Sequence, residues 1–377
     1  MVSYWEHKIF FPPDVVLVAG AGITGLSAAL YLKQRLPELS ITVLDAGIPP
    51  GGATTRNAGF ACIGSLTELL DDVSQHGQDQ ALNLSLRRLR GLERLRQLLG
   101  DKALSYQPCG NYEIFFPEDT EILEKALAWM PQVNEWFASR GYSDPVFQVV
   151  EAPKGLPADA KYILNRLEGV LDSGRLYMEL SEKARKAGIT LVYGLKIKSF
   201  KEDAKSVLVN LEGDDVIICR ALALCTNAFA RQLVPSLPVE PARGVVMVSE
   251  VCQGFEKITP AGFHHHMGYN YFRFLDGRLL IGGGRHLFLK REFTLNPEPP
   301  GDIQRYLAGL AARITGQSSL RFQYVWTGFM GKGPSKDPLI QPLGQRVFCA
   351  VRLGGMGVAL GCEVGETLAD LMVSHLV

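Results

Sequence analysis

The sequence has no C-x-x-C pair, no long uninterrupted apolar run and no excess of charge of either sign. Lys plus Arg and Asp plus Glu number 39 each, so no overall field attracts nucleic acid or an anionic membrane surface. Arg220 interrupts the longest apolar candidate, residues 216–230, which leaves it short of the ~20 residues that a membrane span needs. We therefore expect neither a membrane span nor a nucleic-acid partner.

The cysteines indicate a reducing compartment. The chain has seven, an odd number without the spacing of a metal or redox motif. They are Cys62, Cys109, Cys219, Cys225, Cys252, Cys349 and Cys362. Residues 1–11 carry Glu6, His7 and Lys8 and lack the apolar core of a secretory signal. A cytoplasmic location is predicted.

A metal site is not expected. His264, His265 and His266 are consecutive, and consecutive strand residues point to opposite faces of a sheet. Their side chains therefore cannot all reach one ion, and the pattern favours a polar strand or loop.

What the sequence does contain is enough apolar material for two domains. It has 377 residues, of which 47% are hydrophobic and 21% charged. This composition is ordinary for a globular protein, and the length exceeds what one compact core usually holds.

The first motif is a dinucleotide-binding βαβ unit. An apolar run at residues 15–19 enters Gly20-Ala21-Gly22-Ile23-Thr24-Gly25, and a second apolar run ends at Asp45. Gly20 permits a sharp turn, Gly22 permits close approach to a pyrophosphate, and Gly25 permits tight packing of the helix on the sheet. The phosphates would sit at the helix N-terminus, and the Asp45 carboxylate would accept hydrogen bonds from an adenosine ribose.

Leucine spacing predicts a long helix from about Glu68 to Leu99. The leucines that recur every three or four residues, and so form one buried stripe, are Leu86, Leu89, Leu92, Leu95 and Leu99. The arginines that fall mostly off this stripe, and that we interpret as a solvated face, are Arg87, Arg88, Arg90, Arg94 and Arg96. Further helices are predicted at about residues 118–140 and 363–376.

The later part of the sequence has two patterns, first alternating helices and strands and then consecutive strands. A helix and a strand within residues 169–193, then strands at 206–211 and 216–225, predict a return to a parallel sheet. From Arg243 onward the pattern predicts strands, at residues 245–251, 269–275 and 278–281. The dipeptide Asp276-Gly277 is a strong two-residue hairpin signal. An antiparallel sheet inserted into an α/β framework is therefore predicted.

Glycine clusters at residues 20–25, 51–64, 282–284 and 354–361. Each cluster permits close approach of the backbone to another group. A nicotinamide enzyme needs one such loop, whereas a larger cofactor buried between domains needs several.

The order of these motifs resembles the family of FAD-dependent amine and amino-acid oxidoreductases that includes D-amino-acid oxidase, glycine oxidase, sarcosine oxidase and γ-glutamylputrescine oxidase. The resemblance covers nearly the whole chain. It rests on the βαβ motif, on the loop at 51–59, on Cys225-Thr226-Asn227-Ala228, on the strands at 271–283 and on the glycine-rich turn at 354–361. The resemblance implies FAD as cofactor.

The resemblance also implies which residues contact FAD. They are Gly20, Gly22, Ile23, Thr24, Gly25, Asp45, Ala46, Gly51, Gly52, Thr54, Thr55, Arg56, Asn57, Ala58, Gly59, Ile197, Thr226, Asn227, Ala228, Gly355, Met356, Gly357 and Val358. Arg56 can neutralise a phosphate, or else form a surface ion pair. The N–H groups of residues 355–358 can bond the flavin O2 carbonyl and stabilise negative charge on the reduced ring. Cys62 and Cys362 could form a thioether to the flavin, although a buried apolar thiol is favoured for each.

The substrate side departs from the family pattern. Carboxylate-binding members place an arginine shortly after a tryptophan, in the region aligned with residues 326–334, and this chain has none there. Lys332 is the nearest cation, although a lysine lacks the bidentate fork that reads a carboxylate. Arg285 is an alternative clamp, and Tyr271 matches the family tyrosine that lines the substrate pocket. Tyr271, Arg285 and Lys332 are thus the candidate catalytic residues.

The predicted fold is α/β, a discontinuous Rossmann-like, glutathione-reductase-like FAD-binding domain with an inserted substrate domain of antiparallel sheet and helices. The FAD-binding domain is placed at residues 12–82, 155–238 and 326–377, and the substrate-binding domain at 83–154 and 239–325.

The resemblance implies an FAD-dependent oxidoreductase that oxidatively deaminates or dealkylates a small amine or amino acid. A hydride would pass from the carbon next to nitrogen to flavin N5, with oxygen as the favoured acceptor. A quinone or protein carrier, a flavin-holding module without turnover, and a nicotinamide dehydrogenase using only the first motif stay open. The sequence leaves the oligomeric state and the substrate undetermined.

Overall fold

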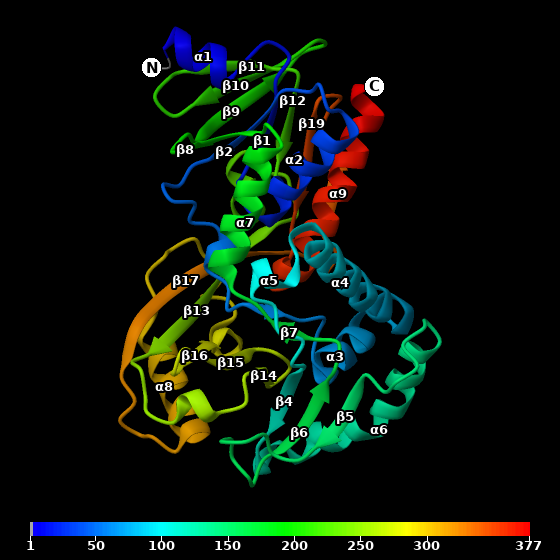
Figure 1. Cartoon of the computed structure of the whole chain (residues 1–377), viewed down its shortest axis with the longest axis vertical. Coiled ribbons are helices and arrows are strands. Elements are labelled where there is room, and N and C mark those ends of the chain that lie inside the picture. Colours follow the sequence, from blue (N-terminus) through cyan, green and yellow to red (C-terminus); the bar gives the residue numbers. More distant parts are fainter. Residues whose placement is uncertain (1–2) are drawn as a thin grey trace.

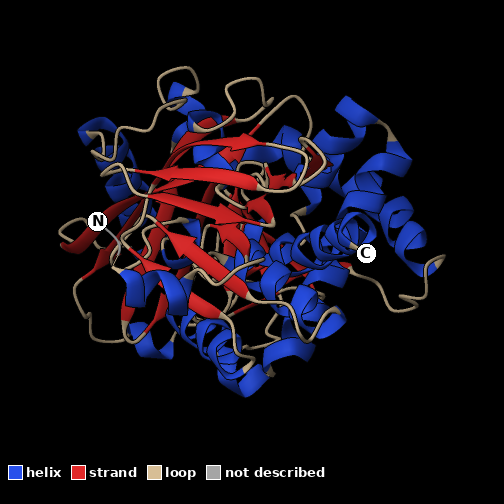
Figure 2. Cartoon of the chain, turned by 90° about the horizontal axis from the view of Figure 1, so that it is seen from above, coloured by secondary structure: helices blue, strands red, loops and turns tan. Residues whose placement is uncertain are grey.

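Two sheets dominate the structure, a computed structural model in which residues 3–377 are described (Figure 1). A six-stranded sheet lies in the upper half of Figure 1 and an eight-stranded sheet in the lower half. Seen from above, helices surround the strands and gather on the side where the C-terminus is marked (Figure 2). The predicted α/β class is confirmed. Met1 and Val2, the start of the stretch tested for a signal, lie outside the described residues.

The six-stranded sheet contains the βαβ unit. Its strands, in spatial order, are β18 (Leu339–Pro342), β19 (Val347–Val351), β12 (Ala221–Leu224), β1 (Val16–Ala19), β2 (Ile41–Asp45) and β8 (Thr190–Tyr193). All neighbours pair in parallel except β18. The helices on this sheet are α2 (Ile23–Arg35), α7 (Ser173–Lys186) and α9 (Gly357–Leu376). Helix α2 leaves β1 at Gly22, and β2 ends at Asp45, as the motif predicted.

Helix α9 begins at Gly357, six residues before the predicted start at Glu363. Glycines weaken a helix by roughly 0.5–1 kcal/mol each, which is why the sequence indicated a later start. The glycines are used for packing instead. A Cβ at Gly361 would lie 2.7 Å from Ile23 Cγ2, and one at Gly365 would lie 2.7 Å from the Thr24 carbonyl oxygen, so both let α9 approach α2 closely.

The strand predicted at 216–225 is two strands that belong to different sheets. Arg220 separates β11 (Val216–Cys219) from β12, and its side chain donates a hydrogen bond to the Leu376 carbonyl oxygen. β11 joins β10 (Val207–Leu211) and β9 (Ile197–Glu202) in a separate antiparallel sheet. The expected return to the parallel sheet is therefore correct for β8 and β12 and wrong for residues 206–219.

The eight-stranded sheet forms the second body. Its strands, in spatial order, are β17 (Phe322–Lys332), β13 (Glu240–Ser249), β16 (Arg278–Gly283), β15 (Asn270–Leu275), β14 (Gly262–His265), β4 (Asn111–Phe115), β6 (Lys161–Asn165) and β5 (Phe147–Val150). The predicted hairpin is confirmed, since Asp276 and Gly277 have φ of 51° and 69° between β15 and β16. Helices α8 (Gly301–Thr315) and α6 (Thr120–Ala138) cover this body. In its core the rings of Phe263 and Phe272 stack at 4.8 Å.

Sheet membership departs from the predicted domain boundaries. β6 lies inside the range 155–238, yet it pairs with β4 and β5 of the eight-stranded sheet. β17 crosses the boundary at 325/326, and a single helix, α4 (Gln78–Leu99), crosses the one at 82/83. The predicted boundaries followed changes in the sequence pattern from helical to strand-like, whereas strand pairing decides which sheet a segment joins. The division into FAD-binding and substrate-binding domains stays a prediction.

The long helix predicted from Glu68 to Leu99 is two helices, α3 (Leu66–His76) and α4. Gly77 has φ of 82°, outside the helical region, and breaks the run. The interpretation of Arg88 as part of a solvated face is wrong, because this residue is only 2% exposed and its side chain donates a hydrogen bond to the Ile63 carbonyl oxygen. The leucine stripe is confirmed for Leu89, Leu92 and Leu95.

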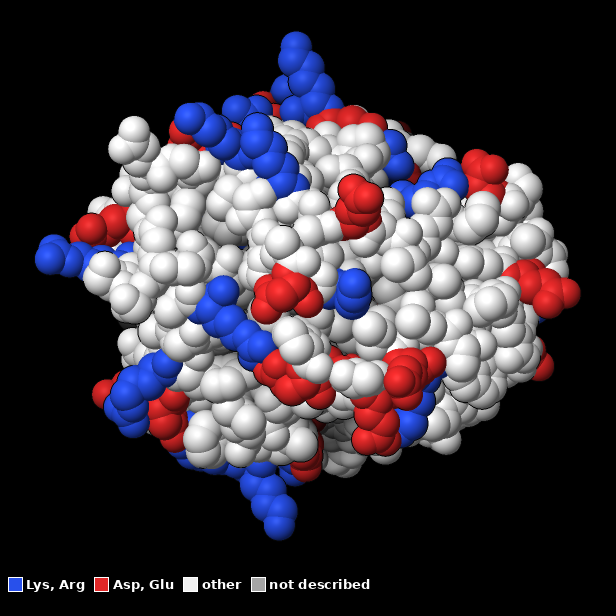
Figure 3. All heavy atoms as spheres, turned by 90° about the horizontal axis from the view of Figure 1, so that it is seen from below, with Lys and Arg blue, Asp and Glu red and all other residues white. Residues whose placement is uncertain are grey.

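The remaining elements are short. They are α1 (Tyr4–Phe10), α5 (Asp101–Leu104), β3 (Phe60–Ala61), β7 (Gly169–Val170), η1 (Ala53–Thr55), η2 (Pro117–Asp119), η3 (Asn227–Gln232), η4 (Phe255–Lys257) and η5 (Arg285–Phe288). Within residues 3–377 no helix combines the length and apolar character needed to cross a membrane. On the face seen from below, acidic and basic side chains are interspersed among uncharged ones (Figure 3).

The α2–α9 contact can be tested with Gly365→Ala. The added methyl would lie 2.7 Å from the Thr24 carbonyl oxygen and 2.8 Å from the Ala28 nitrogen, so the helices must separate. We expect a net loss of about 1–3 kcal/mol in stability, together with weaker FAD binding, because the start of α9 moves with the helix. Thermal denaturation and FAD titration measure both effects.

The matched control is Gly309→Ala in α8, where a Cβ would meet nothing within 4 Å. This change should raise stability by roughly 0.5–1 kcal/mol and leave FAD affinity unchanged. Equal effects of the two substitutions would contradict the assigned role of Gly365.

Candidate active site

A cavity of about 860 Å³ lies between the two main sheets. At one end it is lined by the β1–α2 loop, including Gly20 and Gly22, and at the other by residues of the eight-stranded sheet, including Val246 and Tyr271. A volume of this size accommodates a ligand larger than a typical metabolite. The cavity therefore joins the dinucleotide motif to the antiparallel sheet.

The βαβ end of the cavity is held by hydrogen bonds to the backbone. Asp45 accepts one from the Ala21 N–H through Oδ2 (2.9 Å) and one from the Gly47 N–H through Oδ1 (2.9 Å). Gly20 has φ of 108°, and a Cβ there would lie 2.7 Å from the Cys225 carbonyl oxygen. Each carboxylate oxygen of Asp45 has further acceptor capacity, so the side chain is fixed at the edge of β2 while facing the cavity.

The second loop is fixed by its own side chains. Asn57 donates to the Thr54 carbonyl oxygen (2.6 Å) and accepts from the Gly59 N–H (2.8 Å), while the Thr54 hydroxyl accepts from the Ile23 N–H (3.0 Å). Arg56 donates to the Thr327 carbonyl oxygen of β17 (3.0 Å). Within residues 3–377 Arg56 forms no ion pair, which rules out the surface-pair interpretation and leaves its charge free for an anion.

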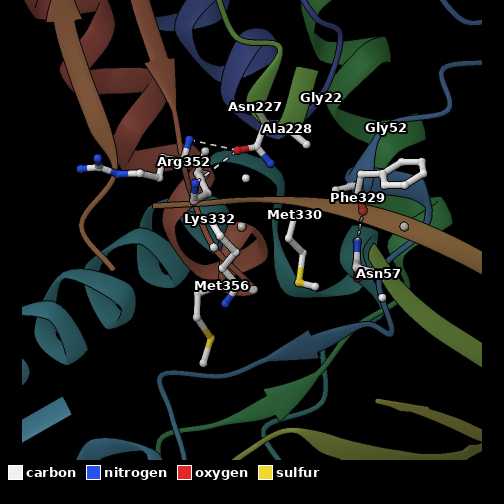
Figure 4. Close-up of a pocket in the computed structure, with 18 of the residues that line it drawn as sticks. Gly22, Gly52, Asn57, Asn227, Ala228, Phe329, Met330, Lys332, Arg352 and Met356 are labelled. Atoms are coloured by element: carbon white, nitrogen blue, oxygen red, sulfur yellow. Dashed lines mark hydrogen bonds between the residues drawn. The ribbon is translucent and has the colours of Figure 1, made fainter. Parts of the chain in front are cut away.

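The third wall comes from the C-terminal part of the chain. Asn227 Oδ1 accepts hydrogen bonds from the N–H groups of Arg352 (3.0 Å) and Leu353 (3.3 Å), as Figure 4 shows. These bonds fix the turn that leads from β19 to Met356 and the start of α9. Residues 354–359 line the cavity, and the first-turn N–H groups of a helix have no partner within the helix.

The structure brings most predicted cofactor residues to this one cavity. Those that line it are Gly20, Gly22, Ile23, Thr24, Asp45, Ala46, Gly51, Gly52, Thr54, Arg56, Asn57, Ala58, Ile197, Thr226, Asn227, Ala228, Gly355, Met356, Gly357 and Val358.

Three predicted residues do not line the cavity. A Cβ at Gly25 would overlap the Gly20 carbonyl oxygen, and one at Gly59 would overlap the Leu171 carbonyl oxygen. Both glycines therefore serve close packing. Thr55 donates its hydroxyl proton to the Pro50 carbonyl oxygen (3.1 Å). We leave these three out of the proposed cofactor contacts.

The residues present fit an elongated dinucleotide. Thr226 Oγ1 is buried and has no hydrogen-bond partner in the described chain, although it belongs to the cavity wall. Buried polar groups are normally paired, so this hydroxyl is available to a ligand. A Cβ at Gly52 would meet nothing within 4 Å, so a ligand can approach the backbone there closely. Arg56 supplies positive charge, and the start of α9 supplies N–H donors.

Tyr271, Arg285 and Lys332 also line this cavity. The Tyr271 ring packs against Gly282, where a Cβ would lie 2.6 Å from Tyr271 Cζ, and burial raises the Tyr271 pKa to about 12. Burial, aided by the charge of Arg285, lowers the Lys332 pKa to about 8. Within residues 3–377 neither cation has an ion pair or a side-chain hydrogen bond, although Arg285 lies 5.7 Å from the centre of the Tyr269 ring.

A charged cluster beside these residues was missed by the sequence analysis. Glu68 lines the cavity with its side chain 13% exposed, and it pairs with Arg88 and Lys336 at 3.6 Å each. Asp72 is buried and also contacts Lys336. Burial alone would raise the pKa of Glu68, but Arg88 and Lys336 outweigh it and lower that pKa. The only signal was Ser65 three residues before Glu68, which reads as a helix start, and Ser65 does cap α3.

His264 forms a second missed feature. It is 5% exposed, lines the cavity and lies 3.4 Å from Glu168, whereas His265 pairs with Asp119 on another side. Burial opposes protonation of His264, but Glu168 and neighbouring carboxylates raise its pKa. No group of three or more metal-ligating side chains occurs in the described chain.

The two cysteines near the cofactor loops differ in position. Cys62 lines the cavity, with its Sγ 3.5 Å from Met356 Sδ, whereas Cys362 is buried away from the cavity beside Tyr31. Burial raises the pKa of both thiols, which makes them poor nucleophiles. Each cysteine is therefore interpreted as a small buried apolar side chain rather than as a point of attachment for the flavin.

The fold has two main sheets, and one cavity runs between the dinucleotide motif and the largely antiparallel sheet. This arrangement is typical of flavoproteins. The model of the family described as FAD dependent oxidoreductase, DAO, matches residues 15–371. The chain belongs to this family of FAD-dependent oxidoreductases. FAD is its cofactor, and the family consists of enzymes. This assignment contradicts both a nicotinamide dehydrogenase and a flavin-holding module without turnover.

Individual relatives are distant. The bifunctional protein ThiO/ThiG of Synechocystis sp. is 23% identical over 338 residues, which are 86% of this chain and 46% of that protein. The chain thus spans about half the length of this curated relative. Among solved structures, L-proline dehydrogenase from P. horikoshii has a TM-score of 0.74 at 17% identity, covering 96% of this chain and 94% of that one. Glycine oxidase from Geobacillus kaustophilus has a TM-score of 0.74 at 18% identity, with the same coverage. These likenesses show the fold.

Gly52→Val tests the cofactor wall. Because a Cβ here meets no neighbour, the apoprotein should fold normally, while the larger side chain should obstruct the backbone approach that FAD needs. We expect at least about tenfold weaker FAD binding, the equivalent of ~1.4 kcal/mol. Titration of the apoprotein with FAD measures this, and unchanged affinity would show that Gly52 is not part of the wall.

Proposed function

We propose that this protein oxidises a small amine or amino acid at the carbon next to nitrogen. The observation that carries the proposal is Arg285, a cation without an ion pair in residues 3–377, which lines the same cavity as the FAD-binding loops together with the half-buried ring of Tyr271. A charged, half-buried group without a counterion is costly unless a ligand supplies one. A substrate carboxylate would do so.

FAD supplies the two-electron acceptor that takes the hydride from the substrate carbon. The chain orients the substrate and excludes water. The positive charge of Arg285 near the bound substrate lowers the pKa of its amine, which favours the neutral amine whose lone pair assists hydride loss. The imine that results is hydrolysed by water to a carbonyl compound and ammonia, or a smaller amine.

Arg285 is the proposed carboxylate partner. Its planar guanidinium can form two parallel hydrogen bonds to a carboxylate, which a lysine cannot. It follows the Gly282-Gly283-Gly284 run at the end of β16, where Gly284 has φ of 73° and turns the chain into η5. Tyr271, on the neighbouring strand, would form the wall beside the substrate.

Oxygen is the proposed electron acceptor, on the family resemblance. A quinone or protein carrier is the alternative, and it draws support from the dehydrogenase among the structural neighbours. A cytoplasmic setting is also proposed, since all seven cysteines are free thiols.

The function is tested by mixing the purified FAD-loaded protein anaerobically with a panel of amines and amino acids. Bleaching of the visible flavin absorbance by any member is the expected result. Re-oxidation by air then supports oxygen as acceptor, whereas re-oxidation by a quinone but not by air supports the alternative. Absence of bleaching across both classes would refute the proposed function.

Arg285→Met tests the carboxylate contact. Loss of a charge-assisted hydrogen-bond partner costs about 1.5–3 kcal/mol, so the KM of an amino-acid substrate should rise about 10- to 100-fold while kcat changes less. Steady-state kinetics measure this. The matched control is the amine with the same carbon skeleton but no carboxylate, whose KM should barely change. An equal loss for both substrates would contradict the contact.

A further inference from the structure

Lys332 lies at a different place from Arg285 within the cavity. It is the last residue of β17, and Gly331 before it accepts a hydrogen bond from the Gly354 N–H (3.0 Å). The Lys332 Nζ lies 3.9 Å from the position that a Cβ would occupy on Gly354. The side chain therefore ends beside the turn that immediately precedes α9.

The neighbouring side chain on the same face of β17 confirms this direction. Met330 Sδ lies 3.6 Å from the position of a Cβ on Gly355, the next residue of the turn. Figure 4 shows Met330 and Lys332 projecting from the same side of β17, with Lys332 directed toward Met356. Met330 and Lys332 thus lie against the part of the wall formed by residues 354–356.

Lys332 also differs from the other two lysines that line the cavity, Lys196 and Lys336. Lys196 pairs with Glu212 at 2.6 Å. Lys336 has two carboxylate neighbours, Asp72 and Glu68, so its charge is compensated within the protein. Lys332 has no ion pair and no side-chain hydrogen bond anywhere in residues 3–377. Its positive charge is therefore available to whatever lies against the turn.

We propose that Lys332 acts on the flavin rather than on the substrate: its ammonium group, together with the N–H groups at the start of α9, stabilises the negative charge that two-electron reduction places on the ring. This assignment rests on the FAD cofactor alone and goes beyond the proposed substrate. The helix N-terminus and the ammonium group contribute positive potential from two elements to one wall of the cavity. The reduced cofactor is thereby favoured over the oxidised one.

The surroundings of Lys332 agree with this role. Burial lowers its pKa to about 8, and the charges of Arg285, Lys336 and Arg88 act in the same direction, whereas Glu68 opposes them. An added negative charge nearby favours the protonated lysine. Reduction of the flavin therefore strengthens the same ammonium charge that favours reduction.

The decisive comparison is between wild type and Lys332→Met, both loaded with FAD. Methionine is of similar length and removes only the charge. We expect the reduction potential to fall, with an about tenfold shift in the equilibrium between reduced and oxidised flavin, which is about 30 mV for a two-electron couple. Equilibration with a redox dye measures it. Binding of sulfite to oxidised flavin, read from loss of visible absorbance, should weaken in parallel.

Two variants control the comparison. Lys332→Arg keeps the charge and should retain most of the wild-type potential. Arg285→Met also removes a cavity cation, but one assigned to the substrate, and should move the potential much less than Lys332→Met. If Lys332→Met does not fold, Lys332→Gln also provides a neutral side chain, and the same fall in reduction potential and sulfite affinity is expected.

The outcomes separate cleanly. An unchanged potential and sulfite affinity in the neutral variant, with weaker binding of carboxylate ligands such as acetate, would place Lys332 on the substrate and overturn the inference. Equal potential shifts for Lys332→Met and Arg285→Met would also overturn it. Neither measurement uses a substrate, so failure of every amine and amino acid to reduce the flavin would refute the proposed function without affecting this test.

Discussion

The contact between helices α2 and α9 is the constraint on which the site depends. Gly361 and Gly365 have no side chains, so α9 packs directly on Ile23 and on the backbone of Thr24. α2 starts at the first dinucleotide loop and α9 starts at the last glycine-rich turn. Close packing of two helices that each begin at the cavity therefore brings the first and last motifs of a long chain to one ligand. Any substitution that separates the helices moves both motifs.

The walls of the cavity are largely backbone, and many polar side chains around it are engaged in holding that backbone in place. Asn57 closes its own loop, Asn227 ties η3 to the turn before α9, and Thr54 receives the Ile23 N–H. A cofactor that binds through phosphates and carbonyl groups needs donors at fixed positions more than it needs particular side chains. This explains how backbone walls of this kind can be kept while identity to solved structures of the same fold falls to 17% and 18%.

The cations beside the eight-stranded sheet differ in whether neighbouring carboxylates compensate their charge. Beside the eight-stranded sheet, Glu68 and Asp72 compensate Lys336 and Arg88, while Arg285 and Lys332 have no ion pair within residues 3–377. Arg285 and Lys332 differ in position, since Arg285 lies at the end of β16 and Lys332 beside the turn before α9. In the proposed assignment one cation faces the substrate and the other faces the flavin, an arrangement that a single family arginine would not provide.

The sequence alone determined the parts of the molecule in which local chemistry decides the outcome. The βαβ unit, the Asp276-Gly277 hairpin and the four glycine clusters were readable because positive φ and close backbone approach demand glycine wherever they occur. Three outcomes depended on contacts between distant segments. Arg88 is buried because Glu68 and Asp72 of another helix pair with it, and α9 starts early because α2 offsets the cost of its glycines. Glu68 faces the cavity, although the sequence around it indicated only that a helix starts at Ser65. Charges and helix starts of this kind are settled by which segments meet in space, and that information exists only in the tertiary structure.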